Sequence, residues 1–163
     1  MKEYDRAAAV AYAHRWAYGR NPAYYNFDAL GGDCTNFASQ CLYAGGGVMN
    51  YRPTFGWFYR SANDRSPSWT GVPFFYNFLT RTDGSPGPLA EETTLERCSP
   101  GDFVQLRFGP GRFGHTPIIV AMGETPTLSN TLVAAHTFDT DYKPLSGYGF
   151  EELRFLHILG SIW

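Results

Sequence analysis

The segment GGDCTNFASQCLYAGG, residues 31–46, places a cysteine directly after two glycines and an aspartate, at the head of an apolar stretch. Apolar residues recur at helical spacing after this cysteine, and consecutive glycines end the pattern. We therefore predict a helix over residues 34–44 that begins at Cys34. A cysteine that served only for packing would be expected further along, on the buried stripe where Cys41 lies.

A thiol in the first turn of a helix has chemical consequences. The free N–H groups and partial positive charge of the helix start stabilise a thiolate, which predicts a pKa for Cys34 below the ordinary value of about 8.5. The same N–H groups can hold the oxyanion that forms when sulfur attacks a carbonyl, with Asp33 beside them as an auxiliary residue. The alternative is a structural cysteine with Asp33 as N-cap, and we expect Cys41 and Cys98 to be structural.

A nucleophilic cysteine needs a base, and His115 is the candidate. It opens the apolar stretch HTPIIVAM after a glycine-rich turn, so its ring can project into a cleft while the following residues anchor a strand. His136 lies on the next expected strand, and pairing of the two strands would let it orient the His115 ring. Asp139 and Asn130 are alternatives for that orienting role.

The remaining histidines have ordinary explanations. His14 lies in the first expected helix and is assigned to the surface or to packing. His157 lies in an apolar terminal strand and is assigned to the core.

Periodicity changes along the chain from helical to alternating. Helices are expected over 3–18, 34–44 and 72–81 (with Thr70 as N-cap of the last), a loop over 82–101, and strands over 102–108, 115–122, 131–138 and 153–159. Helices followed by antiparallel strands indicate an α+β fold. A length of 163 residues suits one domain, residues 1–163.

Composition narrows the function classes. Apolar residues make up 44% and charged residues 17% of the chain, which is typical of a globular protein. A net charge of -2 without a basic run argues against nucleic acid as a partner. No apolar stretch is long enough for a membrane span, and no signal peptide is evident. The chain is therefore expected to be cytoplasmic, or a segment of a longer secreted or cell-wall-associated protein.

Three cysteines without a CxxC pair fit neither a disulfide framework nor a zinc site. The aromatic residues Trp57 and Trp69 lie in an irregular stretch after the cysteine helix. Their flat faces suit binding of a sugar or a peptide backbone on a cleft wall, and the equal alternative is that they close the core.

Several of these elements together resemble a known family. The segments YDRAAAVAYAHRWA, GDCTNFASQCLYAGG, PGDFVQL, GHTPIIV and AAHTFDTDYKPL resemble the "putative amidase" domain of bacterial, often cell-wall-associated, proteins. That domain belongs to the broad papain-like group with the CHAP and NlpC-type cell-wall peptidases. The resemblance covers nearly the whole chain, and the D-C-T-N-F-x-S-Q motif is its most specific part.

The resemblance implies a papain-like fold in which N-terminal helices, including the cysteine helix, pack on an antiparallel half-barrel sheet. It implies Cys34 as nucleophile, His115 as general base and then acid, and His136 in the orienting position. It requires no metal or organic cofactor. A tyrosine upstream of the cysteine lines the site in related enzymes, and Tyr25, or its neighbour Tyr24, is the candidate here.

The function expected from these features is a cysteine-dependent amidase or peptidase that forms a thioester acyl-enzyme. Its substrate would be a peptide or other amide, with peptidoglycan peptides as the leading case. Two alternatives remain: an acyl transferase with the same Cys–His chemistry, and a peptide- or glycan-binding module without turnover.

Overall fold

The structure is a computed structural model that describes residues 1–163. Its helices are α1 Arg6–Trp16, α2 Cys34–Gly46, α3 Pro67–Thr70 and α4 Val72–Leu79, with short 3-10 helices η1 Leu95–Arg97 and η2 Leu145–Gly147. Its strands are β1 Tyr59–Ser61, β2 Asp64–Arg65, β3 Gly87–Thr93, β4 Phe103–Arg107, β5 Ile118–Ala121, β6 Leu132–Ala135, β7 Thr140–Pro144 and β8 Glu152–Ile162.

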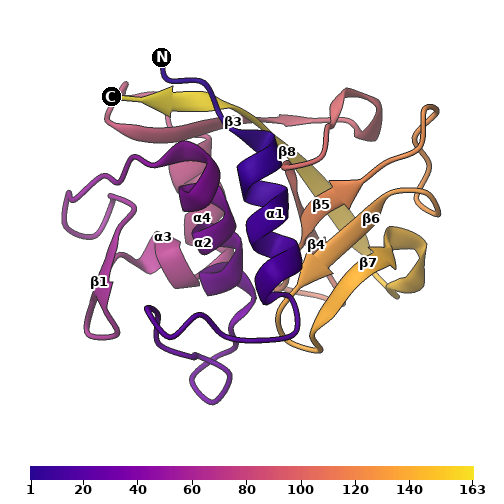
Figure 1. Cartoon of the computed structure of the whole chain (residues 1–163), viewed down its shortest axis with the longest axis horizontal. Coiled ribbons are helices and arrows are strands. Elements are labelled where there is room, and N and C mark those ends of the chain that lie inside the picture. Colours follow the sequence, from indigo (N-terminus) through magenta and orange to yellow (C-terminus); the bar gives the residue numbers. More distant parts are fainter.

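Six strands form one antiparallel sheet in the order β3-β8-β4-β5-β6-β7, and β1 and β2 form a separate hairpin. The sheet curls around the helices, which gather on one of its faces (Figure 1). The α+β class and the antiparallel half-barrel are thus confirmed. The long strand β8 pairs with both β3 and β4 and so connects the edge of the sheet to its centre.

Alternation along the central strands divides the buried residues between the two faces of the sheet. On β5, Ile118 and Val120 join the larger core between sheet and helices, whereas Ile119 joins a smaller core on the opposite face. Phe103 and Val104 of β4 divide in the same way. The period of two in the sequence therefore specifies which face of each strand the helices cover.

Helix α2 is buried along most of its length, because it packs against α1 and α3 and against β3 and β6. Close contact with the N-terminal segment is possible because Gly45 has no side chain: a Cβ there would lie 2.5 Å from the ring of Tyr4. The helix ends at Gly47, whose φ of 67° is in the left-handed region that favours glycine. The sequence stretch around Cys34 thus forms the central helix of the fold.

Three sequence expectations need correction. Gly71, not Thr70, is the N-cap of α4, because Thr70 is the last residue of α3. The expected loop over 82–101 contains β3, which lies at the edge of the sheet where prolines and glycines are tolerated. Strand β7 was also not expected as a separate element, because most of its residues are polar.

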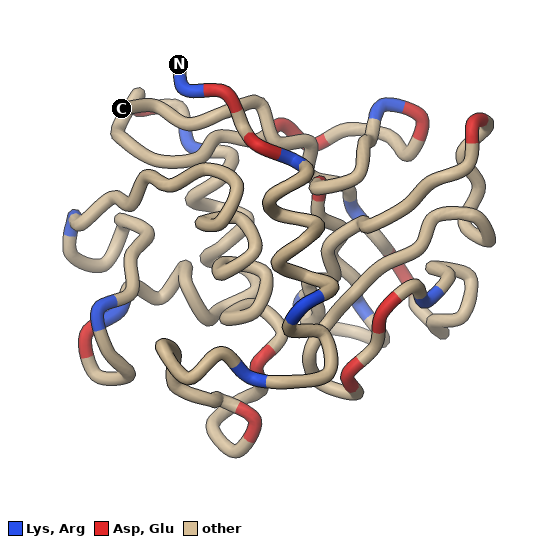
Figure 2. Tube along the Cα trace, viewed as in Figure 1, with Lys and Arg blue, Asp and Glu red and all other residues tan.

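Charged side chains of both signs are scattered along the trace in small groups, and long stretches between them, including all of α2, carry no charge (Figure 2). None of the helices has both the length and the apolar character that crossing a membrane requires.

Candidate active site

Cys34 is the first residue of α2 and is only 8% exposed. Its Sγ lies 3.6 Å from Oγ1 of Thr35 and 4.0 Å from the carbonyl oxygen of Gly114. Gly114 directly precedes His115, so the start of α2 meets the segment that leads into β5. The structure therefore brings the cysteine to the chain segment that carries the expected base.

Threonine and glutamine side chains hold these two segments together. The hydroxyls of Thr35 and Thr116 lie 3.2 Å apart, and Gln105 Nε2 of β4 donates to Thr116 Oγ1 over 3.3 Å. Gln105 Nε2 also donates to the carbonyl of Val72 at the start of α4. These buried hydrogen bonds fix the cysteine turn relative to β4 and to the segment before β5.

The predicted low pKa of Cys34 is not found in this conformation. Burial raises the pKa of the thiol above its ordinary value, and the nearby Asp33 carboxylate adds to this effect. The Thr35 hydroxyl and the backbone N–H groups of Thr116 and Thr35 oppose the shift but do not cancel it. The physical reason is that desolvation of the thiolate outweighs the donors of the helix start.

His115 lies between β4 and β5, in an isolated bridge with Leu106, and is 6% exposed. Phe108 and Tyr148 flank its ring, with centroids 6.1 and 5.6 Å away. Burial, with a smaller effect of the Lys143 ammonium, lowers the pKa of His115 to about 4. The imidazole is therefore neutral at pH 7, as a proton acceptor must be.

His136 does not form the expected contact with His115. Its Nδ1 lies 2.5 Å from Oδ2 of Asp33, and its Nε2 lies 2.7 Å from the carbonyl oxygen of Trp16. The ring also stacks on Phe37 with centroids 4.0 Å apart. Although β5 and β6 pair as expected, the side chain of His136 points to the start of α2 and orients Asp33 instead.

Asp33 is completely buried and occupies the N-cap position of α2, but its side chain forms no capping hydrogen bond and is instead the centre of a polar network. Its carboxylate accepts hydrogen bonds from His136, from Asn36 Nδ2 at 2.9 Å and from the backbone N–H of Phe27 at 2.8 Å. Burial alone would raise the pKa of Asp33, but these three hydrogen bonds lower it below its ordinary value. A carboxylate that remains charged thus anchors the residue just before the cysteine.

The two tryptophans are core residues, which corrects their assignment to a substrate cleft. Trp57 and Trp69 are each 0% exposed and pack against one another with centroids 4.7 Å apart. Trp57 Nε1 donates to Ser39 Oγ and Trp69 Nε1 donates to Asn36 Oδ1. Through Asn36, Trp69 supports the Asp33 network from behind.

Tyr148, not Tyr25, is the tyrosine that lines the cavity beside His115. The Tyr25 ring is half exposed and rests on Phe27, while Tyr24 packs on Trp69. Burial, followed by the negative charge of a Cys34 thiolate, raises the pKa of Tyr148 to about 12, so its hydroxyl keeps its proton. The only sequence signal for this tyrosine is its position between two glycines.

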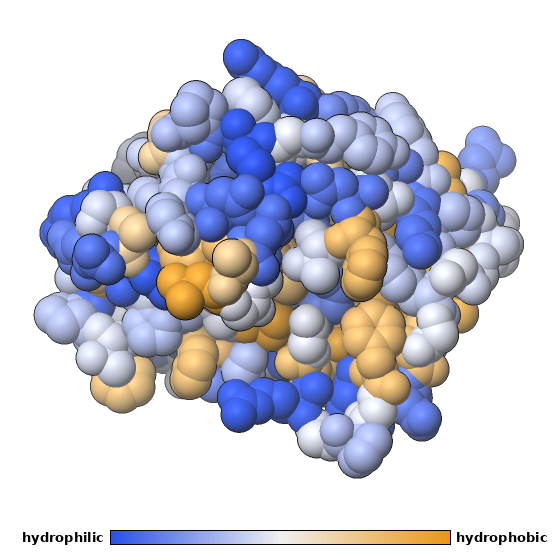
Figure 3. Space-filling model, turned by 90° about the horizontal axis from the view of Figure 1, so that it is seen from below, coloured by the Kyte–Doolittle hydropathy of each residue, from blue (hydrophilic) through white to orange (hydrophobic).

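A cavity of about 450 Å³ opens beside His115. Its walls come from four separate segments: Phe108, Gly114, His115, Thr137, Phe138, Lys143, Gly147, Tyr148 and Gly149. Phe108 is 49% exposed and Phe138 is 95% exposed, so two aromatic rings reach solvent at its mouth. In Figure 3, which is seen from below Figure 1, hydrophobic side chains reach the surface in several patches among hydrophilic ones.

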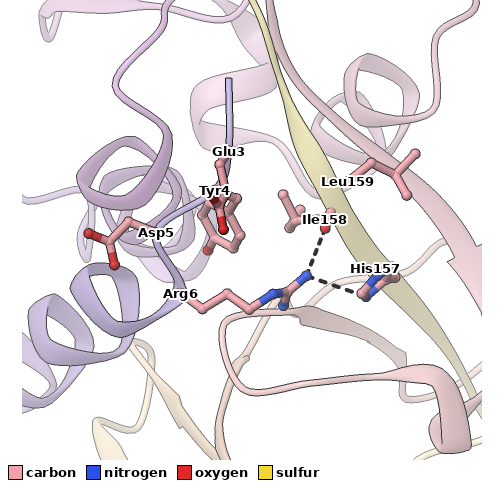
Figure 4. Close-up of a pocket in the computed structure, with 7 residues that line it drawn as sticks. All are labelled: Glu3, Tyr4, Asp5, Arg6, His157, Ile158 and Leu159. Carbon is pink, nitrogen blue, oxygen red and sulfur yellow. Dashed lines mark hydrogen bonds between the residues drawn. The ribbon is translucent and has the colours of Figure 1, made fainter. Parts of the chain in front are cut away.

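A larger cavity of about 740 Å³ lies between the N-terminal segment and β8 (Figure 4). Arg6 crosses it to donate to the carbonyl of Ile158 and to approach His157 Nδ1. His157 and Arg6 both pair with the buried carboxylate of Asp102, at 2.7 Å each. His157 is thus held by a structural hydrogen bond to Asp102 and lies partly exposed on the cavity wall, not in the core as expected. No cysteine lines this cavity.

The other predicted structural residues behave as expected. Cys41 and Cys98 are buried and, like Cys34, form no disulfide. His14 pairs with Asp141 at 2.8 Å near the surface.

The chain matches a known protein family over nearly its whole length. Residues 3–158 match the model of the family described as "Putative amidase domain". A protein of Bacillus subtilis (strain 168) named "Uncharacterized protein YhbB" is 38% identical over 143 residues. The match covers 85% of this chain but 43% of that relative, so the chain spans less than half of the relative's length. No solved structure matches significantly. The family match covers almost the entire chain, from the first helix to the last strand, and the protein belongs to this amidase domain family.

Proposed function

We propose that the protein is a cysteine-dependent amidase or peptidase of papain-like type, formed by one domain over residues 1–163. The observation that supports this most directly is the approach of the Cys34 thiol to the segment that carries His115. Membership of the amidase family supports amide hydrolysis as the reaction class.

In the proposed mechanism, His115 accepts the thiol proton as Cys34 Sγ attacks the amide carbonyl. Backbone N–H groups at the start of α2 hold the oxyanion. The C–N bond breaks when His115 returns the proton to the leaving amine, which leaves a thioester on Cys34. Water, deprotonated by His115, then cleaves the thioester, releases a carboxylic acid and restores the thiol.

The raised pKa of Cys34 and the lowered pKa of His115 favour a neutral thiol and a neutral imidazole at rest. Proton transfer is then concerted with attack on the substrate, rather than complete beforehand as in a stored ion pair. His136 and Asp33 serve as positioning residues in this proposal, because their hydrogen bonds hold the turn that presents the cysteine.

Peptides of the bacterial cell wall are the substrates we propose to test first, in line with the resemblance to cell-wall peptidases. Purified protein is incubated with muropeptides, and new amino groups and fragment masses are measured. Cys34→Ala and His115→Ala are each expected to reduce hydrolysis by at least about a thousandfold. Cys98→Ala is the matched control and should retain activity.

Unchanged hydrolysis in Cys34→Ala would overturn the cysteine mechanism. Addition of an amine acceptor separates hydrolysis from transfer, because only a transferase gives mainly the amine adduct. Binding to isolated cell wall without any product would favour the non-catalytic module instead.

A further inference from the structure

The cavity beside His115 contains one unpaired cation. Lys143, on β7, is one of only two lysines in the chain. Its ammonium lies 4.3 Å from the centroid of the Tyr148 ring, and no carboxylate lies within ion-pair distance of it. The side chain is half-buried and lines the cavity.

The acidic residues nearest to it in the sequence are already engaged elsewhere. Asp141 accepts from His14 at 2.8 Å, and Asp139 accepts from Arg20 at 2.9 Å. Lys143 is therefore the only formally charged residue of the cavity wall, because the His115 ring is neutral. A half-buried ammonium without a counter-ion offers a ready partner for an anionic group of a ligand.

The remaining walls restrict what that ligand can be. Tyr148 lies between Lys143 and His115 and contacts both, so the cation and the proposed base share one wall. Phe138 stands 95% exposed at the mouth, in a turn where Thr137 and Phe138 both have positive φ, at 65° and 56°. Consecutive left-handed non-glycine residues cost of order 1 kcal/mol or more each, and such strain clusters at ligand sites.

The strained turn is also connected to the cysteine. The hydroxyl of Thr137 accepts from the backbone N–H of Asp33 at 3.4 Å. The turn that carries Phe138 is therefore hydrogen-bonded to the residue directly before Cys34.

We propose that Lys143 binds a substrate carboxylate, so that the preferred substrates are amides with a free carboxylate one or two residues from the scissile bond. Phe108 and Phe138 would contact the apolar part of the same substrate. This inference rests on the proposed function, because it takes the bound carboxylate to be part of an amide substrate. The binding of a carboxylate can nevertheless be measured without turnover.

The test uses the two lysines of the chain as internal reporter and control. The Cys34→Ala protein is labelled with lysine that carries ¹³C at Cε, and its two signals are assigned with Lys143→Met. It is titrated with N-acetylglycylglycine and, separately, with the uncharged amide of the same dipeptide. Lys2 also lies over an aromatic ring, that of Trp163 at 5.7 Å, and so reports non-specific effects at a similar lysine.

We expect the Lys143 signal to shift saturably with the acid and not with the amide, while the Lys2 signal stays in place. In the active protein, Lys143→Met should raise KM for a cleaved substrate with a carboxylate by about tenfold and leave KM for its amide unchanged. Lys143→Arg should retain most of the preference, and Lys2→Met should have no effect.

Equal shifts of both lysine signals, or no shift of Lys143 at any acid concentration, would overturn the proposal. The two proposals fail separately. Specific binding without hydrolysis of any amide would remove the enzymatic function but not the carboxylate site. If the unmutated protein hydrolyses the acid and the amide equally well, the carboxylate site is removed and the enzymatic function stands.

Discussion

At the scale of single residues, the most consequential feature is the burial of charge directly beside a thiol. Asp33 stays ionised in the interior because His136, Asn36 and a backbone N–H group donate to it, and because Arg20 lies 3.5 Å away. Each nitrogen of the His136 ring faces an oxygen atom, the Asp33 carboxylate on one side and the Trp16 carbonyl on the other. A buried hydrogen-bonded network centred on a carboxylate thus holds the first turn of α2 from behind.

A comparison of two carboxylates that contact Arg20 tests this interpretation. Asp33→Asn is expected to lower the free energy of unfolding by about 3 kcal/mol, because Arg20 loses a buried counter-ion and the groups that donate to Asp33 lose a charged acceptor. Asp139→Asn should cost less than about 1 kcal/mol, since Asp139 is partly exposed and Arg20 keeps Asp28. Urea denaturation at pH 7 measures both, and equal losses would refute the special role of Asp33.

The candidate site was only partly predictable at this scale. Cys34 and His115 stand out because each occupies a special position in a local pattern, one at a helix start and one at a strand start. Lys143 and Tyr148 carry no such pattern and become neighbours only when β7 and the segment after η2 fold together. The type of a residue does not determine whether its side chain is buried. For this reason the sequence suits Trp57 equally to a cleft wall and to the core.

At the scale of elements, α2 explains how a short motif determines the fold. Its apolar faces pack on α1, α3 and the sheet, and its polar residues Ser39 and Asn36 bond to tryptophans in the core. The change from helical to alternating periodicity located β4, β5, β6 and β8. Strand β3 is not predicted because it begins with Gly87 and Pro88, which signal a loop, although both can be accommodated at the edge of the sheet.

The close packing at the end of α2 can be tested with adjacent glycines. Alanine is favoured over glycine within a helix by about 1 kcal/mol. Gly45→Ala should nevertheless destabilise the protein by about 2 kcal/mol, because the new Cβ would lie 2.7 Å from the backbone carbonyl oxygen of Asp5. Gly46→Ala is the control, since only the Ser161 hydroxyl lies near, at 3.0 Å. The free energies of unfolding are measured by chemical denaturation. If both variants are as stable as the parent protein, this packing is contradicted.

At the scale of the whole molecule, burial of His115 couples the proposed base to global stability. The folded protein holds its pKa near 4, whereas an unfolded chain has the ordinary value of about 6.5. Between these values the unfolded state binds more protons, so stability falls as pH decreases from about 6.5 to 4. The full difference is about 3 kcal/mol.

Replacement of His115 by glutamine should remove this part of the pH dependence. We expect the parent protein to lose about 3 kcal/mol more than His115→Gln when the free energy of unfolding is measured at pH 7 and again near pH 4. Carboxylates also contribute to the pH dependence near pH 4, but they are common to both proteins and their contributions cancel. Parallel pH profiles for the two proteins would show that His115 is not desolvated in solution.

The pairing of the two chain ends has a consequence for how this domain can be connected. Lys2 and Ser161 exchange backbone hydrogen bonds of 2.7 and 2.9 Å, and both ends lie at the same edge (Figure 1). The last turn of α2 touches Ser161, while its first residue is Cys34, about 20 Å away along the helix. A linker attached at either end would therefore depart from the domain at a point far from the thiol. A circular permutant that joins the two ends directly would leave access to the cavity unchanged.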